Sequence, residues 1–190
     1  LRHALGASYE NRMIGSLADM TVLSFHPVKH ITSGEGGAIT TNNPQYHEKL
    51  QMLRSHGIDK NTMSRTGPAG DWAYDMKYLG RNYRLTDFQA ALGISQMKKL
   101  DTFIARRNEI ARYYNGRLSE TDGISVPVTK PGIRHAWHIY TVVLQKHNRD
   151  EIFRRLRSAG IGVNVHYIPI YKFSYYRENL PQTEQFPVTE

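Results

Sequence analysis

The longest regular pattern in the chain is helical, and its length limits the folds that the chain can adopt. Thr86-Asp87-Phe88-Gln89 has the Thr-x-x-Gln form of a capping box, which marks the start of a helix. A straight helix from there to about Leu118 would have about 33 residues and span about 50 Å, more than one domain layer. We therefore predict a helix that links two domains or bends, with Gly93 as a candidate bend. The apolar residues that keep its 3.6-residue rhythm are Phe88, Leu92, Leu100, Phe103, Ile104 and Ile110.

The residues before this helix predict a mixture of strands and helix. Thr21–Phe25 and Gly37–Thr41 are short β-branched or apolar runs bounded by polar residues, which is typical of strands. Pro44 is expected at the start of a helix that runs roughly to Arg54. Residues 55–70 are polar and contain glycine, which predicts a long loop.

The residues after the helix predict a second, smaller α/β unit. We expect a strand over 137–144, a helix over 150–159 with Asp150 as its N-cap, and a strand over 163–167. The tail from Tyr171 is rich in Tyr, Pro and Gln and predicts a loop. The fold class indicated is therefore α/β.

Composition excludes some classes of function. Apolar residues make up 39% of the 190 residues, and no run approaches the length of a membrane span. Cysteine is absent, which excludes disulfides and thiolate metal sites. The net charge of +8 is spread along the chain without a DNA- or RNA-binding motif. We expect a cytoplasmic protein that binds neither membranes nor nucleic acid.

Lys29 is the residue most suggestive of chemistry. It lies between the end of a predicted strand and the glycine-rich stretch Thr32–Gly37, a setting that suits a lysine forming a Schiff base. Most lysines are solvated surface charges, so the neighbouring residues decide the interpretation. His135, His138 and His166 invite comparison with a zinc site, but no acidic or cysteine partner stands at ligand spacing, and we predict no metal.

Several blocks resemble one known family. The chain is similar to the PLP-dependent sugar aminotransferases of the DegT/StrS type along nearly its whole length. The blocks that carry the resemblance are His3–Ala7, Met20–Asn43, Gly80–Gly93, His135–Tyr140 and Gly160–Tyr171, of which those around Lys29 and Asn82 are the most specific.

The resemblance implies roles for four residues at the cofactor. Lys29 would form the Schiff base with pyridoxal 5′-phosphate (PLP) and carry the proton, and Ser24 would donate its hydroxyl to the cofactor phosphate. His3 would lie near the cofactor's phenolic oxygen, and Asn82 would reach the phosphate of the partner's cofactor across a homodimer interface. Taken alone, Ser24 suits a strand end bonded to backbone, and His3 suits a structural histidine.

The resemblance also implies a substrate site. Arg84 would bind a substrate anion, since a guanidinium suits phosphate oxygens. Tyr167, Ile168 and Tyr171 would line the pocket for the sugar nucleotide. The alternatives are that Asn82 and Arg84 only shape the start of the helix, and that the tyrosines are half-buried packing residues.

The implied fold is part of the type I PLP-dependent transferase fold. Residues 1–80 would be the back half of the large domain, 81–118 the linking helix, and 119–190 most of the small C-terminal domain. The implied reaction takes an amino group from L-glutamate, through the PLP and PMP forms, to C4 of a UDP-linked 4-keto-6-deoxy sugar for cell-surface glycans of the pseudaminic acid type. A 4-keto sugar of the aminoarabinose or perosamine type, or a non-catalytic regulatory homologue, remains as an alternative.

Both ends of the chain interrupt sequence that looks structured. The chain begins at Leu1 without a methionine, and the family's aspartate for the pyridine nitrogen would lie one residue earlier. Family members are about twice as long. We therefore expect a fragment that does not catalyse transamination by itself.

Overall fold

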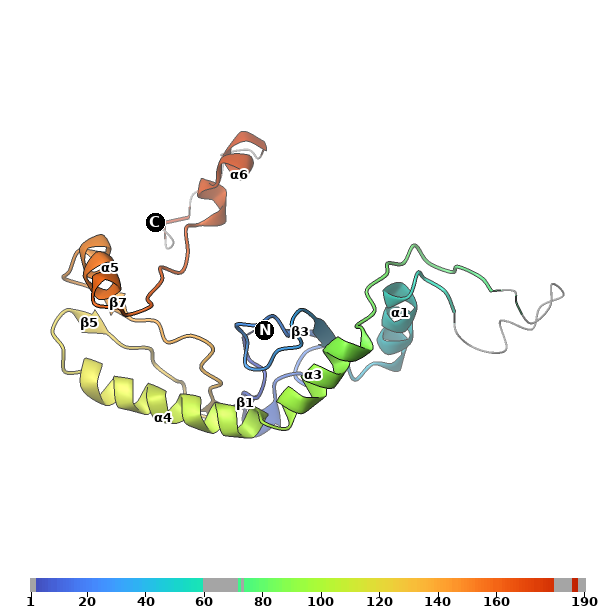
Figure 1. Cartoon of the computed structure of the whole chain (residues 1–190), viewed down its shortest axis with the longest axis horizontal. Coiled ribbons are helices and arrows are strands. Elements are labelled where there is room, and N and C mark those ends of the chain that lie inside the picture. Colours follow the sequence, from blue (N-terminus) through green and yellow to red (C-terminus); the bar gives the residue numbers. More distant parts are fainter. Residues whose placement is uncertain (1–2, 60–71, 73, 180–185, 188–190) are drawn as a thin grey trace. The chain divides into compact units, whose positions relative to one another are not determined.

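The computed structural model describes residues 3–59, 72, 74–179 and 186–187 (Figure 1). The chain divides into two compact units, Leu1–Val143 and Leu144–Glu190. It contains both strands and helices, which confirms the mixed α/β class. Among the described residues, no helix is long and apolar enough to cross a membrane.

A two-stranded ribbon frames the loop that contains Lys29. Thr21–Ser24 (β3) pairs antiparallel with Gly37–Thr40 (β4), with Thr21 opposite Thr40 and Ser24 opposite Gly37. Both predicted strands are confirmed. A Cβ at position 37 would lie 2.6 Å from the carbonyl oxygen of Leu23, so this register requires glycine there.

Short strands form two further sheets. Arg12–Met13 (β2), Ser8–Tyr9 (β1) and Ile133–Arg134 (β6) form a three-stranded antiparallel sheet in that order. Ile124–Ser125 (β5) pairs with Val143–Leu144 (β7). Strands of two residues carry too little pattern to be seen in a sequence.

Helix α1, Pro44–Arg54, begins as expected. The side-chain oxygen of Asn43 accepts hydrogen bonds from the backbone N–H groups of Gln45 and Tyr46, and Pro44 occupies the first turn, where no N–H is needed. The expected loop after α1 falls largely on residues 60–71, which lie outside the described residues. Ile58 forms an isolated bridge with Met76, so the described ends of this segment run antiparallel.

The long helical pattern is two helices, Asp87–Met97 (α3) and Leu100–Leu118 (α4). The capping box of Thr86 and Gln89 is confirmed. The break falls at Lys98 and Lys99 rather than at Gly93, where a Cβ would make an ordinary contact of 3.7 Å with Ser33. The two helices differ in burial. Helix α4 buries Leu100 and Ile104 in the core, whereas α3 has no buried residue, so the helix breaks where its packing against the core begins.

The core of the first unit is small and lies beside the Lys29 loop. Ile104 is fully buried, and Ile31, two residues after Lys29, is 2% exposed. Partly buried Ala4, Leu5, Ile14 and Phe25 pack around this cluster, whose buried members are Ala7, Ile31, Leu100, Ile104 and Ala136. The core therefore holds the segment between β3 and β4 at Phe25 and at Ile31.

The second unit differs from the sequence expectation at several points. Helix α5, Arg149–Ser158, has Asn148 as its N-cap instead of Asp150, because the Asn148 side chain accepts from the N–H groups of Asp150 and Glu151. The tail is partly helical, with a 3₁₀ turn over Ile170–Lys172 (η1) and α6 over Ser174–Asn179.

Two predicted strands are mostly irregular. Only Val143–Leu144 of the stretch 137–144 is strand, and residues 163–167 contain none. A strand needs a neighbour that pairs with its N–H and C=O groups. The described residues offer 163–167 no such neighbour, and most of that stretch is exposed.

Candidate active site

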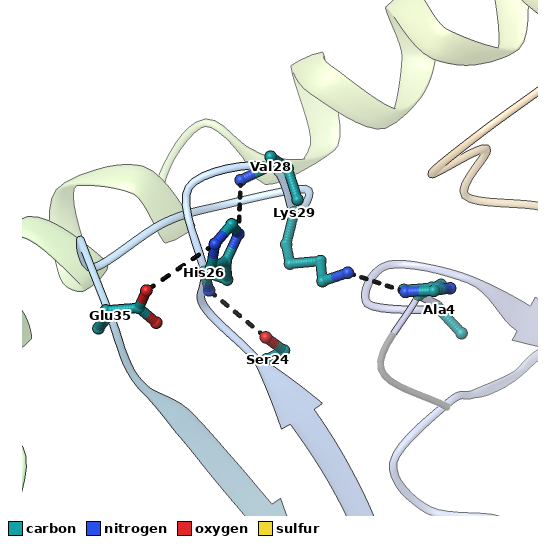
Figure 2. Close-up of a pocket in the computed structure, with 7 residues that line it drawn as sticks. Ala4, Ser24, His26, Val28, Lys29 and Glu35 are labelled. Carbon is teal, nitrogen blue, oxygen red and sulfur yellow. Dashed lines mark hydrogen bonds and ion pairs between the residues drawn. The ribbon is translucent and has the colours of Figure 1, made fainter. Parts of the chain in front are cut away.

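The amine of Lys29 lies between two imidazoles. Its Nζ is 2.8 Å from Nε2 of His3 and 3.3 Å from Nε2 of His138. Figure 2 shows the lysine side chain extending from its loop toward the segment of Ala4. Three segments that are distant in sequence therefore meet at one nitrogen atom.

Hydrogen bonds within the loop hold the backbone around Lys29. The backbone N–H of Lys29 donates to the carbonyl of His26 at 2.9 Å, and the N–H of Val28 donates to Nδ1 of His26 at 3.2 Å. The N–H of Ser33 and the hydroxyl of Thr32 both donate to the carbonyl of Phe25. These bonds close the loop at its base and fix the backbone from which the Lys29 side chain extends.

An open pocket of about 770 Å³ lies in front of this amine. Figure 2 shows Ser24, His26 and Lys29 around it, with Glu35 forming a 3.8 Å ion pair with His26. The residues that line it are His3, Ala4, Ser24, His26, Val28, Lys29 and Glu35.

Ser24 presents its hydroxyl to the pocket from the last position of β3. Its oxygen accepts a long hydrogen bond of 3.4 Å from the N–H of His26. That bond uses the oxygen as an acceptor, so the hydroxyl hydrogen can be donated to a ligand in the pocket.

Two of the imidazoles near Lys29, those of His138 and His30, have a lowered pKa. Burial lowers the pKa of His138 to about 4, and the charges of His3, Lys29, His30 and Arg107 add to the effect. Burial likewise lowers the pKa of His30 to about 4, together with the charge of Arg107. At neutral pH His138 can therefore face an amine without opposing it with a positive charge of its own.

The structure brings together three of the residues proposed from sequence: Lys29, Ser24 and His3 all line the one pocket. Asn82 and Arg84 are exposed on the segment before α3 and do not line it. The N–H groups of Arg81 and Tyr83 donate to the carbonyls of Leu53 and Arg54, which anchors this segment to the end of α1. The partner-site role of Asn82 stays a prediction.

The remaining candidates lie in the second unit. Tyr167 is 70% exposed, Ile168 is 61% exposed, and the ring of Tyr171 stacks on Phe186 with centroids 4.8 Å apart. Their role in binding a sugar nucleotide also stays a prediction.

Sequence reasoning assigned no role to His138 or Arg107. Guanidinium Nη1 of Arg107, on α4, donates to the carbonyls of Trp137 and His138, and the His138 ring then contacts Lys29. The histidines of the His-x-x-His spacing were weighed only as metal ligands. Among the described residues, no group of three or more His, Cys, Asp or Glu is arranged to hold a metal ion.

The fold and the lysine pocket can be compared with known proteins. A model of the DegT/DnrJ/EryC1/StrS aminotransferase family matches residues 2–190. The chain belongs to this family.

Two individual relatives resemble almost the whole of this chain. A UDP-4-amino-4,6-dideoxy-N-acetyl-beta-L-altrosamine transaminase of Campylobacter jejuni is 42% identical over 181 residues, which are 94% of this chain and 46% of the relative. The structure of Helicobacter pylori PseC, an aminotransferase of pseudaminic acid biosynthesis, superimposes with a TM-score of 0.83 at 33% identity, covering 94% of this chain and 47% of PseC.

A third relative bears on the cofactor. The putative sugar aminotransferase Spr1654 of Streptococcus pneumoniae, solved in its PMP form, has a TM-score of 0.83 at 30% identity and covers 94% of this chain and 47% of its own. The chain thus spans about half the length of the relatives that it matches.

Proposed function

We propose that the chain is the lysine-bearing part of a PLP-dependent sugar aminotransferase. The observation that carries the proposal is the position of the Lys29 amine, 2.8 Å from His3 Nε2 in a pocket that it shares with the Ser24 hydroxyl. Membership of the family and the PMP form of Spr1654 support it.

The residues present fit this cofactor. A primary amine that is partly buried and directed into a pocket can capture an aldehyde, and a hydroxyl with a free hydrogen can donate to a phosphate. The glycine-rich turn brings backbone close to the same space, since Glu35 lines the pocket beside Gly34 and Gly36. When bound, the cofactor supplies an aldehyde and an electron-accepting ring.

Lys29 has two tasks in the proposed reaction. It holds the cofactor at rest, and once an amino donor has displaced it, its amine accepts and returns the proton at the reacting carbon. Hydrogen bonds to Nε2 of His3 and to Nε2 of His138 keep the released amine beside the pocket, and the lowered pKa of His138 leaves that ring without a positive charge to repel it.

The proposed substrates are L-glutamate and a UDP-linked 4-keto-6-deoxy sugar, aminated at C4. The resemblance to transaminases named for the altrosamine product supports the pseudaminic acid type over the aminoarabinose and perosamine types. Arg84 is proposed for a substrate anion, and Tyr167, Ile168 and Tyr171 for the sugar-nucleotide pocket. A homodimer is proposed, with Asn82 serving the partner's cofactor phosphate.

The test has two stages, because the chain spans about half of its relatives' length. In the first, the chain is mixed with PLP, and visible absorbance of lysine-bound PLP is compared with that of Lys29→Ala and of the control Lys98→Ala, an exposed lysine on another segment. Only Lys29→Ala should lose the absorbance. Equal absorbance in all three proteins would refute the cofactor role.

In the second stage, a protein of the family's full length that contains this chain is given L-glutamate and 4-keto sugars linked to UDP. Glutamate should bleach the visible band, and the keto sugar should restore it with formation of a 4-amino sugar. Amination of a GDP-linked sugar, or of the aminoarabinose precursor alone, would replace the pseudaminic acid type with one of the alternatives. A protein that holds PLP but aminates none of them would favour a non-catalytic homologue.

A further inference from the structure

The turn His135–His138 is held by α4 through four contacts, one for each residue. Ala136 is 1% exposed and belongs to the core with Ile104. Nη1 of Arg107 donates to the carbonyl of Trp137 at 2.9 Å and to that of His138 at 3.3 Å. Nδ2 of Asn108 donates to the carbonyl of His135 at 2.9 Å. Four consecutive residues are therefore each fixed by a contact with the same two turns of helix.

The backbone of this turn is strained. Trp137 has φ of +48°, a left-handed conformation that bulky residues rarely adopt. Such a conformation persists where the surroundings over-determine it, and it is concentrated at functional sites. The bonds from Arg107 to the carbonyls of the Trp137–His138 and His138–Ile139 peptides hold this conformation in place.

The hydrogen-bond partners of Arg107 are unusual for a half-buried cation. Arginines withdrawn from water are usually paired with a carboxylate. Among the described residues, none of the ion pairs includes Arg107, and its bonds go to two carbonyls instead. The neighbouring Arg106, by contrast, forms an exposed ion pair with Glu109 at 2.8 Å.

The turn places the imidazole of His138 beside the amine of Lys29. Nε2 of His138 lies 3.3 Å from Nζ, and the ring is flanked by His3 at 4.2 Å and by His30 at 5.5 Å between centroids. A lysine side chain has many rotamers, and holding its end requires contacts that offset the lost freedom. His3 supplies one such contact, and His138 supplies the second.

We propose that Arg107 is a positioning residue for Lys29, acting through the turn His135–His138 to hold the imidazole of His138 against the ε-amine. The significance of the held amine rests on the proposed function, but the geometry concerns only residues of this chain. Arg107 thereby connects α4, whose Ile104 anchors the core, to the nitrogen that captures the cofactor.

The first experiment measures the amine without any cofactor. The chain is acylated with a limiting amine reagent at one fixed pH, and the ratio of modified Lys29 to modified Lys98 is read from peptides by mass spectrometry. In Arg107→Ala this ratio should rise about three- to tenfold, the change expected when a hydrogen bond that held the amine is lost. Arg106→Ala, with the adjacent guanidinium removed, should leave it unchanged.

A double-mutant cycle separates positioning from general loosening. His138→Ala should raise the ratio as much as Arg107→Ala, and the double variant should raise it no further, because both changes break the same connection. Guanidinium ion at low concentration should restore the ratio in Arg107→Ala and not in His138→Ala. If Arg107→Ala loses its helical circular dichroism, Arg107→Lys carries the test, since its single ammonium cannot reproduce the fork.

The outcomes distinguish this inference from the proposed function. An unchanged or lowered ratio in Arg107→Ala, or additive effects in the double variant, would overturn the positioning role even if PLP binds to Lys29. Conversely, a chain that never captures PLP would refute the proposed function, while a raised ratio in Arg107→Ala would still uphold the geometric role of Arg107.

Discussion

Acid should destabilise the first unit through His30. This side chain is 3% exposed, and among the described residues neither ring nitrogen has a hydrogen-bond partner of ordinary geometry. Burial is the main cause that lowers its pKa from 6.5 to about 4, the charges of Arg107, His3 and His135 act in the same direction, and a contact with the Ala136 backbone opposes them. The folded protein therefore takes up the proton less readily than the unfolded chain.

The magnitude follows from this difference in proton uptake. Stability from a lowered histidine pKa is complete above 6.5, the value in the unfolded chain, and is lost as the pH falls toward the folded value. From about pH 7 to about pH 5, His30 alone should cost about 2 kcal/mol of unfolding free energy. This is a large part of the stability of a small domain.

The assay is denaturant unfolding at each pH, followed by tryptophan fluorescence, to which Trp137, in the turn beside His138, and the exposed Trp72 both contribute. In His30→Asn, which cannot titrate, the loss of stability between the two pH values should be smaller by about 2 kcal/mol. His47→Asn, a change on the exposed face of α1, should behave like the parent. Equal pH dependence in the parent and in His30→Asn would refute the assignment to His30.

Three further predictions concern packing and the pocket. Gly80→Ala places a Cβ 2.0 Å from the backbone nitrogen of Gly57 and should cost about 1–3 kcal/mol in a denaturant titration, whereas Gly116→Ala on α4, with nothing within 4 Å, should be neutral or stabilising. Ile104→Ala should cost about 2–5 kcal/mol by the same titration, and Ile110→Ala, at a residue 40% exposed, clearly less; equal losses would mean that Ile104 is not a core anchor. Ser24→Ala should weaken equilibrium binding of PLP by about three- to tenfold without changing the unfolding midpoint, and unchanged binding would remove the phosphate role from Ser24.

Local signals in the sequence predicted local structure well. The capping box at Thr86 and the proline at position 44 placed two helix starts correctly, because a helix start is decided by a few neighbouring residues. The strands at Thr21 and Gly37 were found because each is a short apolar or β-branched run between polar flanks, although Leu23 is the one buried apolar residue of the two strands.

Features that depend on distant contacts were not predictable in the same way. The break at Lys98 follows from which helix reaches the core, and residues 163–167 show strand-like alternation without a partner strand among the described residues. Asn148 competes with Asp150 for the same capping position, and the sequence contains both.

The residues of the site likewise divide into those that local sequence predicts and those that depend on distant contacts. Lys29 and Ser24 stand five residues apart and could be proposed together from the sequence. The contact between Lys29 and His138 spans 109 positions, and the turn that carries His138 accepts hydrogen bonds from Arg107 and Asn108. A His-x-x-His spacing gives no sign of such a contact.

The most direct test of the account is to find where PLP becomes attached. The chain is incubated with PLP, reduced with borohydride, digested, and searched for phosphopyridoxyl groups on every lysine. The account predicts that the group is concentrated on the Lys29 peptide and that free phosphate, as a competitor for the Ser24 hydroxyl, reduces its amount. An even distribution over exposed lysines such as Lys98 and Lys99, with Lys29 unmodified, would contradict it.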